Sequence, residues 1–310
     1  MRILNICADD WANYMYSQSM AMRSIGMDVI ALKSNRHSFG YEDQCSVSSD
    51  SHISNLIKAA DLVQIFHSCK RSANLVRSVN PNIPITVWHT GSLYRAAPKE
   101  TSNFFAQNNN IKLELTDQCE FLSVDPRLAY VAVAIDIHRI RRYQVEKQIG
   151  TRYIVSHYPS KSSVKGTEDI LRMMRPLKDL CTFKSDDKIV PHKEQIRRMS
   201  EADIYIELFK PVLNGQPYGC FGVTAFEAAA LGKIVVTNNI GKDAYESVCG
   251  NCELVIANTE YAFSTYMRDL LSMNPAQIKD KQTKTLEWVV EKHSLKATGE
   301  RIKSILSNLI

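Results

Sequence analysis

The hydrophobic and polar positions along the chain predict short buried strands that alternate with amphipathic helices. Residues 2–7 are expected to form a strand, apolar side chains then recur at near-helical spacing up to Ile25, and residues 28–32 are expected to form the next strand. A strand, a helix and a second strand in this order form a βαβ unit, in which the strands lie parallel and the crossover is right-handed. The chain is therefore predicted to open with a parallel sheet.

The clearest unit of this kind lies further along the chain, in residues 219–237. Residues 223–231 are good helix formers, Gly232 stands where a helix end favours positive φ, and residues 234–236 are β-branched. Such a run is typical of a strand buried on both faces of a parallel sheet. Amide groups at the start of the helix lack partners inside it, so the preceding turn is a candidate anion site. Glu227 can reach a neutral polyol such as a ribose, although a solvated helix face explains it equally well.

Two other predicted strands, residues 61–66 and 85–88, each end at a histidine, His67 and His89. Ligands of parallel α/β sheets bind beyond the carboxyl ends of the strands, so both histidines are candidate site residues. Histidine can donate a hydrogen bond to a hydroxyl or to a developing charge near neutral pH. A structural histidine is the alternative interpretation of each.

The loop after the first predicted strand places two more polar residues at that edge. Asp10 is a candidate N-cap for the following helix, and Asn13 lies in its first turn. Both are candidate ligand-binding residues, and a polar residue on the helix surface is the alternative interpretation of Asn13. Further on, residues 101–112 are polar and contain consecutive asparagines at 108–110, which favours a loop or a weak helix. Residues 120–124 and 130–133 are predicted strands.

Length and composition bound the interpretation. The 310 residues favour two domains, and 45% apolar and 23% charged residues are ordinary for a globular protein. The net charge of +5 weakly favours anionic ligands and is compatible with peripheral membrane contact. No apolar run approaches the ~20 residues that span a bilayer, and the start of the chain lacks a signal-peptide pattern, so we expect a cytoplasmic protein.

Charged and metal-binding motifs are sparse. The basic cluster at residues 138–142 lacks interleaved aromatic residues, so a nucleic-acid partner is not favoured. Of eight cysteines, only Cys249 and Cys252 form a Cys-x-x-Cys pair, and no second pair or histidine follows at zinc spacing. We therefore expect neither a structural zinc site nor a catalytic metal.

The residues from Gly219 to Thr237 resemble the donor-site signature of retaining glycosyltransferases with two Rossmann-like halves, the glycosyltransferase B architecture of the family 4 or group 1 type. The commonest signature is an acid, then Gly-Phe-Gly, then a second acid eight positions after the first. Here the second acid is Glu227, whereas the first is Gly219 and the next glycine is Cys220. The resemblance implies that Glu227 binds the donor ribose, and the missing acid weakens the match to the usual catalytic arrangement.

A second stretch, residues 157–171, resembles the block of these enzymes in which a loop ends in Lys-Gly before a helix. Lys165 is the lysine of this block and implies a cation for the donor diphosphate. The arginine usual five positions earlier is Ser160 here, with Lys161 beside it. Residues 87–91 resemble the strand and loop whose histidine approaches the donor sugar, which implies a catalytic role for His89.

The resemblance implies further roles. An arginine occurs beyond the histidine loop in related enzymes, so Arg95 is expected to bind phosphate or an anionic acceptor, beside the acceptor-side residues Asp10 and Asn13. Glu207 is the nearest upstream carboxylate that can replace the missing acid in catalysis. The remaining donor-binding residues are expected to be His192, Phe221, Gly222, Val223 and Thr224.

The predicted fold is α/β, with two Rossmann-like domains facing across a cleft, residues 1–140 on the acceptor side and residues 141–310 on the donor side. The last helix is expected to cross back to the first domain. The implied function is retaining, metal-independent transfer of a sugar from a nucleoside diphosphate sugar, with UDP slightly favoured and no cofactor, to a glycan, lipid-linked or other hydroxyl acceptor.

Three alternatives stay open at this stage. A non-catalytic protein that binds nucleotide sugars or glycans on the same fold would explain why Gly219 replaces the first acid. A phage or viral enzyme that glycosylates DNA bases is a narrower form of the transferase hypothesis, for which salt-sensitive DNA binding is the test. An inverting mechanism is the third, because the retaining assignment depends on resemblance alone. The sugar and the acceptor are not specified, since fold does not determine function.

Overall fold

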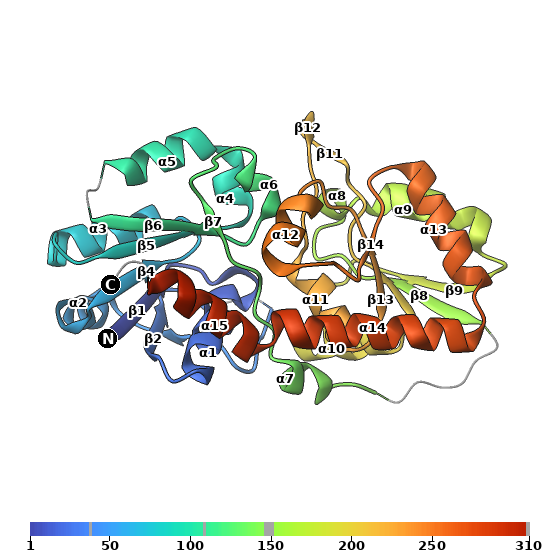
Figure 1. Ribbon diagram of the computed structural model, residues 1–310, viewed down its shortest axis with the longest axis horizontal. Coiled ribbons are helices and arrows are strands. Elements are labelled where there is room, and N and C mark those ends of the chain that lie inside the picture. The colour runs from blue at the N-terminus through green and yellow to red at the C-terminus, as the bar shows by residue number, and fades with distance from the viewer. Residues whose placement is uncertain (37–38, 108–109, 146–151, 308–310) are drawn as a thin grey trace. The chain divides into compact units, whose positions relative to one another are not determined.

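The computed structural model of the chain describes residues 1–36, 39–107, 110–145 and 152–307. The chain divides into two compact units (Figure 1). Unit 1 contains Met1–Ala134 together with a C-terminal segment that begins at His293, and unit 2 contains Ile135–Lys292. Each unit has its own parallel sheet and its own apolar core.

Over the residues described, unit 1 is built on a seven-stranded parallel sheet in the order β3-β2-β1-β4-β5-β6-β7. Its strands are β1 (Arg2–Cys7), β2 (Asp28–Lys33), β3 (Ser46–Val47), β4 (Leu62–Ile65), β5 (Ile85–His89), β6 (Ile111–Thr116) and β7 (Ala129–Tyr130). Its helices are η1 (Trp11–Asn13), α1 (Tyr14–Ser24), α2 (Asp50–Ala59), α3 (Lys70–Val79), α4 (Gly91–Ala96), α5 (Pro98–Ala106), α6 (Cys119–Leu122) and α15 (Leu295–Leu306). The predicted opening βαβ unit is confirmed, because β1 and β2 pair in parallel with α1 between them.

The last helix packs on the first unit, as predicted for this architecture. Helix α15 lies along α1 (Figure 1), and at Gly299 a Cβ atom would lie 2.3 Å from the backbone oxygen of Ala21. The helices therefore approach closely at a point that excludes a side chain. Nδ1 of His293 lies 3.0 Å from the backbone oxygen of Val133, which ties the start of this segment to the end of the unit's first segment.

Unit 2, where described, has a five-stranded parallel sheet in the order β14-β13-β10-β8-β9 and a separate hairpin. Its strands are β8 (Tyr153–His157), β9 (Cys181–Ser185), β10 (Ile204–Ile206), β13 (Ile234–Thr237) and β14 (Val255–Ile256), and the hairpin pairs β11 (Val212–Leu213) with β12 (Gln216–Pro217). Its helices are α7 (Ile137–Arg141), α8 (Ser162–Lys165), α9 (Thr167–Met174), η2 (Arg175–Leu177), α10 (His192–Ser200), α11 (Val223–Ala230), α12 (Lys242–Cys249), α13 (Glu260–Ser272) and α14 (Pro275–His293). The predicted helix and buried strand after Gly222 are confirmed as α11 and β13.

Of two predictions near the end of unit 1, one is wrong and the other is confirmed in part. Residues 120–124 are not a strand, because Cys119–Leu122 form helix α6. In residues 101–112, where a loop or a weak helix was expected, α5 confirms the helix up to Ala106, whereas strand β6 begins at Ile111 and was not predicted. Residues 108–109 are outside the described part. In β6, apolar residues alternate with Lys112, Glu114 and Thr116, a period of two that marks a strand with one polar face.

The helices of the described residues do not meet the requirements for crossing a bilayer. None of them combines sufficient length with sufficient apolar character.

Candidate functional site

Polar side chains gather at the carboxyl ends of the central strands in each unit. In unit 2 the centre of the group is Glu207, directly after β10. Its carboxylate forms an ion pair with the ammonium of Lys165 and accepts hydrogen bonds from the hydroxyls of Thr224 (3.3 Å) and Thr237 (3.0 Å). The Glu207 side chain is fully buried, whereas that of Lys165 is 19% exposed. The pair therefore presents its cationic end to solvent.

Two glycines make this arrangement sterically feasible. Gly166, which follows Lys165, has φ of +69°, and a Cβ there would lie 1.7 Å from the backbone oxygen of Phe209. At Gly222, the residue before α11, a Cβ would lie 2.3 Å from Oε1 of Glu207 and 2.8 Å from Nζ of Lys165. Glycine at these two positions lets the lysine loop and the start of α11 close around the ion pair.

A buried histidine fastens the lysine loop to the sheet. Nδ1 of His157 lies 2.8 Å from the backbone oxygen of Ile206, and its Nε2 lies 2.9 Å from Oγ1 of Thr167. Because a carbonyl oxygen only accepts, Nδ1 carries the proton and Nε2 accepts from the threonine hydroxyl. Burial lowers the pKa of His157 to about 4, so the ring is neutral near pH 7. Thr167 therefore contacts His157 rather than capping α9, where Gly166 is the N-cap.

A second carboxylate contact lies on α11. Oε1 of Glu227 is 2.7 Å from Nε2 of His192, the first residue of α10, and both side chains are at least nine-tenths buried. Tyr205 lies near both carboxylates of this unit: burial first, and then the charges of Glu207 and Glu227, raise the pKa of its phenol well above the usual value. The two predicted donor-binding residues His192 and Glu227 therefore contact each other.

The predicted donor-binding residues around the start of α11 lie in different environments. The side chain of Phe221 is core, with its ring centroid 5.0 Å from that of Tyr245, so only its backbone is a candidate ligand contact. Val223 and Thr224 are half-buried in the first turn of α11. Of the predicted donor-side set, Lys165, Glu207, Gly222 and Thr224 meet at one place, and His192 pairs with Glu227.

The structure gives a steric reason for the absence of an acid at position 219. Gly219 has φ of +146°, and a Cβ there would lie 2.1 Å from Nδ2 of Asn238. That amide donates to the backbone oxygen of Tyr218 (2.8 Å), and its Oδ1 accepts from the backbone amide of Lys210 (2.7 Å). Asn238 thus joins the two ends of the β11–β12 hairpin segment, and the space for a side chain at Gly219 is filled.

In unit 1, Asp10 and His67 lie together after the adjacent strands β1 and β4. Asp10 Oδ1 lies 3.3 Å from His67 Nε2, and the Asp10 carboxylate accepts from the backbone amides of Met15 (2.7 Å) and Tyr16 (3.1 Å). Asp10 therefore satisfies donors at the start of α1, but it is not the predicted N-cap of that helix, because Asn13 occupies the N-cap position. His67 Nδ1 is 2.5 Å from Thr90 Oγ1.

Asn13 is not a helix-surface residue, the alternative interpretation of its sequence position. It is 1% exposed and has φ of 55°. Its Nδ2 donates to the backbone oxygen of Asp43 at 2.9 Å, while its Oδ1 is buried without a hydrogen-bond partner among the residues described. Asn13 therefore helps to fold the loop after β1 against the segment around Asp43, and one acceptor remains unsatisfied.

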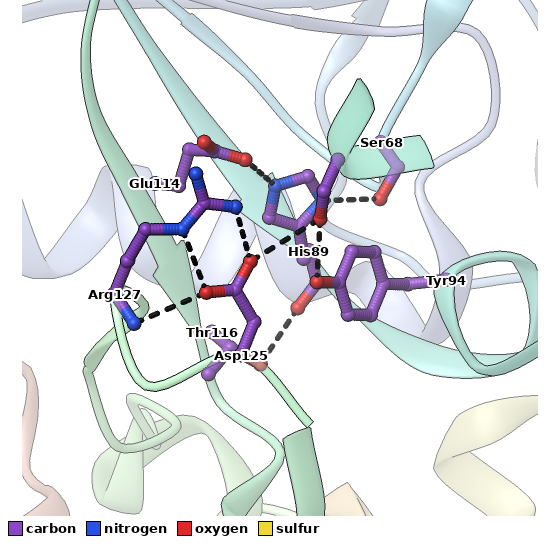
Figure 2. Close-up of polar contacts among 8 residues, drawn as sticks. Ser68, His89, Tyr94, Glu114, Thr116, Asp125 and Arg127 are labelled. Atoms are coloured by element: carbon purple, nitrogen blue, oxygen red, sulfur yellow. Dashed lines mark hydrogen bonds and ion pairs between the residues drawn. The ribbon is translucent and has the colours of Figure 1, made fainter. Parts of the chain in front are cut away.

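His89 is buried in a polar network of unit 1 (Figure 2). Its Nδ1 lies 2.9 Å from Oγ of Ser68 and its Nε2 lies 2.6 Å from Oε2 of Glu114, on opposite sides of the ring. The His89 side chain is 0% exposed and packs on the ring of Tyr94, with centroids 4.4 Å apart. With both nitrogens bonded and no exposed surface, this geometry favours the structural interpretation of His89 over contact with a substrate.

Ser68, His89 and Glu114 are the residue types of a charge relay, but the backbone amide next to the serine is already bonded. The backbone amide of Cys69, which follows Ser68, already donates to the oxygen of Phe66 at 3.3 Å. The lower part of Figure 2 shows a separate ion pair, in which Arg127 donates to both oxygens of Asp125 and lowers the pKa of that carboxyl to about 2. The His89–Glu114 contact joins β5 to β6, whereas the Arg127–Asp125 pair is local to the segment between α6 and β7.

Arg95 is also bound within unit 1. Its Nε donates to Oε1 of Glu120 at 2.6 Å, its Nη2 donates to Oε1 of Gln118 at 3.3 Å, and its guanidinium lies over the ring of Phe121. The side chain is 25% exposed. The predicted anion-binding role would therefore require the arginine to share or leave a short ion pair.

Three residues of the unit 2 group were not predicted as site residues: Thr237, His157 and Asn238. Thr237 and His157 are the last residues of the apolar strands β13 and β8, and Asn238 follows β13. A polar residue at the carboxyl end of an apolar strand is the available sequence signal.

No protein-family model and no characterised protein sequence matches this chain. Solved structures share its fold over almost its whole length. Sucrose-phosphate synthase from Thermosynechococcus elongatus superimposes with a TM-score of 0.66 at 12% identity, covering 100% of this chain and 99% of its own. HepE from Anabaena, in complex with UDP and glucose, superimposes with a TM-score of 0.67 at 12% identity. The match covers 99% of this chain and 100% of HepE. The trehalose-6-phosphate synthase OtsA superimposes with a TM-score of 0.66 at 10% identity, and the match covers 100% of both chains.

At such identities the likeness establishes the fold alone. The chain has the fold of the glycosyltransferase B class, with two Rossmann-like units, as predicted from the sequence.

Proposed function

We propose that this chain is a glycosyltransferase that moves a sugar from a nucleoside diphosphate sugar to an acceptor hydroxyl. Unit 2 takes the donor and unit 1 takes the acceptor. The observation that carries the proposal is the meeting of Lys165 with the start of α11 at the carboxyl ends of β8 and β10, where ligands of parallel sheets bind. A cation and a helix N-terminus at one place suit a diphosphate.

In this proposal Lys165 binds the diphosphate and stabilises the charge that develops as the sugar leaves. An ammonium has three N–H donors, and Glu207 takes one of them. The exposed part of the lysine is therefore free to donate to phosphate oxygens from a fixed position. Such preorganised positive charge is electrostatic catalysis, and it supports a metal-independent transfer.

Glu227 is proposed to bind the ribose hydroxyls of the donor. Its Oε1 contacts His192, and among the described residues no hydrogen bond to its Oε2 is formed, so that oxygen is free to accept. The buried position of this pair keeps the carboxylate in one orientation. A UDP-sugar is the proposed donor, because HepE was solved with UDP and with UDP-glucose. A glycan or another hydroxyl compound is the proposed acceptor, and retention of configuration is proposed from the sequence resemblance.

The direct test is a thermal-shift titration of the full chain with UDP, GDP, ADP, CMP and UDP-glucose. A ligand that binds only the folded state at 100 times its Kd adds about 2.7 kcal/mol of stability. We expect selective stabilisation by UDP and UDP-glucose, which Glu227→Ala weakens. Glu287→Ala, an exposed glutamate on α14, is the matched control and should bind as the wild type does. Absence of stabilisation by any nucleotide would contradict the proposal.

A non-catalytic nucleotide-sugar-binding protein is the second candidate function. The observation that favours it is Gly219, where Asn238 fills the space that an acidic side chain would need. The two candidates differ in turnover. Slow release of UDP from UDP-glucose, or transfer to any member of a broad acceptor panel, supports the enzyme. Binding without either reaction supports the second candidate.

A further inference from the structure

Three buried side chains of metal-ligating type lie together at the carboxyl ends of β1 and β4 in unit 1. They are Cys7, Asp10 and His67, and one ligand atom from each lies within 4.8 Å of the other two. Their exposed fractions are 1%, 1% and 5%. Strands β1 and β4 are neighbours in the parallel sheet, so residues that follow them converge at one edge. This group takes no part in the proposed donor site of unit 2.

The chemistry of the three ligand atoms suits a borderline-soft divalent ion. A thiolate, an imidazole and a carboxylate are the ligands that zinc takes in proteins, usually in tetrahedral geometry. Zn–N and Zn–O bonds of about 2.0–2.2 Å at a tetrahedral angle place the two atoms about 3.4 Å apart. The observed distance between Asp10 Oδ1 and His67 Nε2 is 3.3 Å. A charge-assisted hydrogen bond is typically about 2.7–2.9 Å, so the separation matches the edge of a tetrahedron better.

The surrounding groups orient these ligands as an outer shell does. Nδ1 of His67 lies 2.5 Å from Oγ1 of Thr90, and a proton on Nδ1 leaves Nε2 with its lone pair toward the group. The Asp10 carboxylate is held by the backbone amides of Met15 and Tyr16. Both ligands are therefore fixed in the orientation that coordination needs.

One cysteine belongs to the set. The Cys7 thiol makes no hydrogen bond within the described part of the chain, although it is buried beside a carboxylate and an imidazole. The side chain of Cys45 is also buried, but it is not a member of this group. Cys7, Asp10 and His67 thus supply three ligand atoms from the described part of the chain.

The backbone of the two ligand loops is strained. Within the described ranges, five non-glycine residues have positive φ, and four of them are Ala12, Asn13, His67 and Ser68. These follow or include Asp10 and His67. Left-handed backbone at non-glycine residues costs of order 1–3 kcal/mol each and persists only where other interactions enforce it. A metal ion that joins the two loops would supply such an interaction.

We propose that Cys7, Asp10 and His67 bind a divalent transition-metal ion, zinc in the first instance. The ion joins the loop after β1 to the loop after β4. It is a structural ion of unit 1 and does not replace Lys165 at the diphosphate. The proposal is independent of the proposed function, since it concerns only the stability and geometry of these loops.

The first test is metal analysis of the full chain purified without chelator, followed by cobalt titration after removal of bound metal. We expect elemental mass spectrometry to detect one zinc ion per chain. Cobalt should give thiolate-to-metal charge-transfer absorption and intense d–d bands, which report thiolate ligands and tetrahedral geometry. Wild-type protein with neither bound zinc nor these bands would overturn the proposal without any variant.

Variants then assign the ligands. Cys7→Ser and His67→Gln should each lower cobalt affinity by more than the ~10–100-fold that loss of an outer-shell partner costs. Cys119→Ser is the matched control, a buried cysteine of the same unit outside the group, and should keep the bands and the affinity. Unchanged affinity in both ligand variants, or equal loss in the control, would overturn the assignment.

Discussion

The Lys165 ammonium forms an ion pair with the fully buried carboxylate of Glu207, and this pair joins the end of α8 to the end of β10. Hydroxyls from α11 and β13 bond the same carboxylate. A buried charge that loses its partner is costly, whereas an intact pair fixes both groups in place. Glu207 is thus a positioning residue for the lysine that we propose binds the diphosphate.

Glu207→Gln should therefore weaken both folding and donor binding. The amide keeps the size of the side chain and a hydrogen bond to Thr237 but removes the charge that anchors Lys165. We expect the free energy of unfolding to fall by about 1–3 kcal/mol, measured by urea denaturation. UDP affinity should fall about tenfold, or about 1.4 kcal/mol, measured by calorimetric titration.

The matched control for this substitution is Glu201→Gln. Glu201 pairs with Lys184 in the same unit, but both side chains are well exposed, at 45% and 39%. A surface pair contributes about 0–1 kcal/mol, so this variant should remain near the wild type. Tighter UDP binding by Glu207→Gln would show that Glu207 opposes the phosphate instead of holding the lysine.

Gly222→Ala should disrupt the same ion pair by steric overlap. The new methyl group would lie 2.3 Å from Oε1 of Glu207 and 2.8 Å from Nζ of Lys165, so one of them must move. We expect a loss of stability of about 1–3 kcal/mol and loss of measurable UDP stabilisation in the thermal-shift titration.

Gly232→Ala is the control that separates the effect of steric overlap at Gly222 from the effect of backbone strain. Gly232 has φ of +67°, but the nearest atom to an added Cβ is 4.0 Å away. That variant should lose stability through strain alone and still bind UDP. Equal effects of the two alanines on UDP binding would contradict a specific role for the space at Gly222.

His157 should make unit 2 less stable in mild acid. Burial holds its folded-state pKa at about 4, below the ordinary value of about 6.5. Between these two pKa values the unfolded chain binds more protons than the folded protein. The contribution of neutral His157 to the free energy of unfolding is therefore complete above about pH 6.5 and is lost as the pH falls to about 4. The full loss is about 3 kcal/mol. His157→Gln should flatten this part of the pH dependence in urea denaturation.

The comparison must be made as a difference between the wild type and the variant. Burial raises the pKa of Asp117 to about 6, and this carboxyl changes stability in the opposite direction as pH falls. Asp117 is present in both proteins, so its effect cancels. Parallel stability curves between pH 4 and 7 would rule out the neutral buried histidine.

Gly299→Ala should loosen the last helix from unit 1. A Cβ at this position would lie 2.3 Å from the backbone oxygen of Ala21, so α15 must move away from α1. We expect a loss of about 1–3 kcal/mol in the free energy of unfolding. Lys296→Ala, exposed on the same helix, is the control and should change stability little. Wild-type stability of Gly299→Ala in chemical denaturation would contradict the close packing.

Local patterns were sufficient for much of the fold. The β-branched run at residues 234–236 and the helix formers before Gly232 gave β13 and α11 almost to the residue. Strand β6 was not predicted, although its apolar and polar residues alternate, because the polar run with consecutive asparagines before it favoured a loop or a weak helix. Helix α6 was misassigned as a strand, since a short segment with both apolar and charged residues has no decisive period.

The sequence by itself determined most of the strands and helices and the candidate anion site at α11, and it pointed to Lys165 and Glu227, because these depend on residues close together in the chain. Only the tertiary structure decided which side chains meet. Glu207 reaches Lys165 across 42 positions, and Asn238 fills the space beside Gly219. His89 stands at a strand end, as predicted, but packing by Tyr94 buries it. Burial and partner choice depend on contacts between distant segments, which no local period encodes.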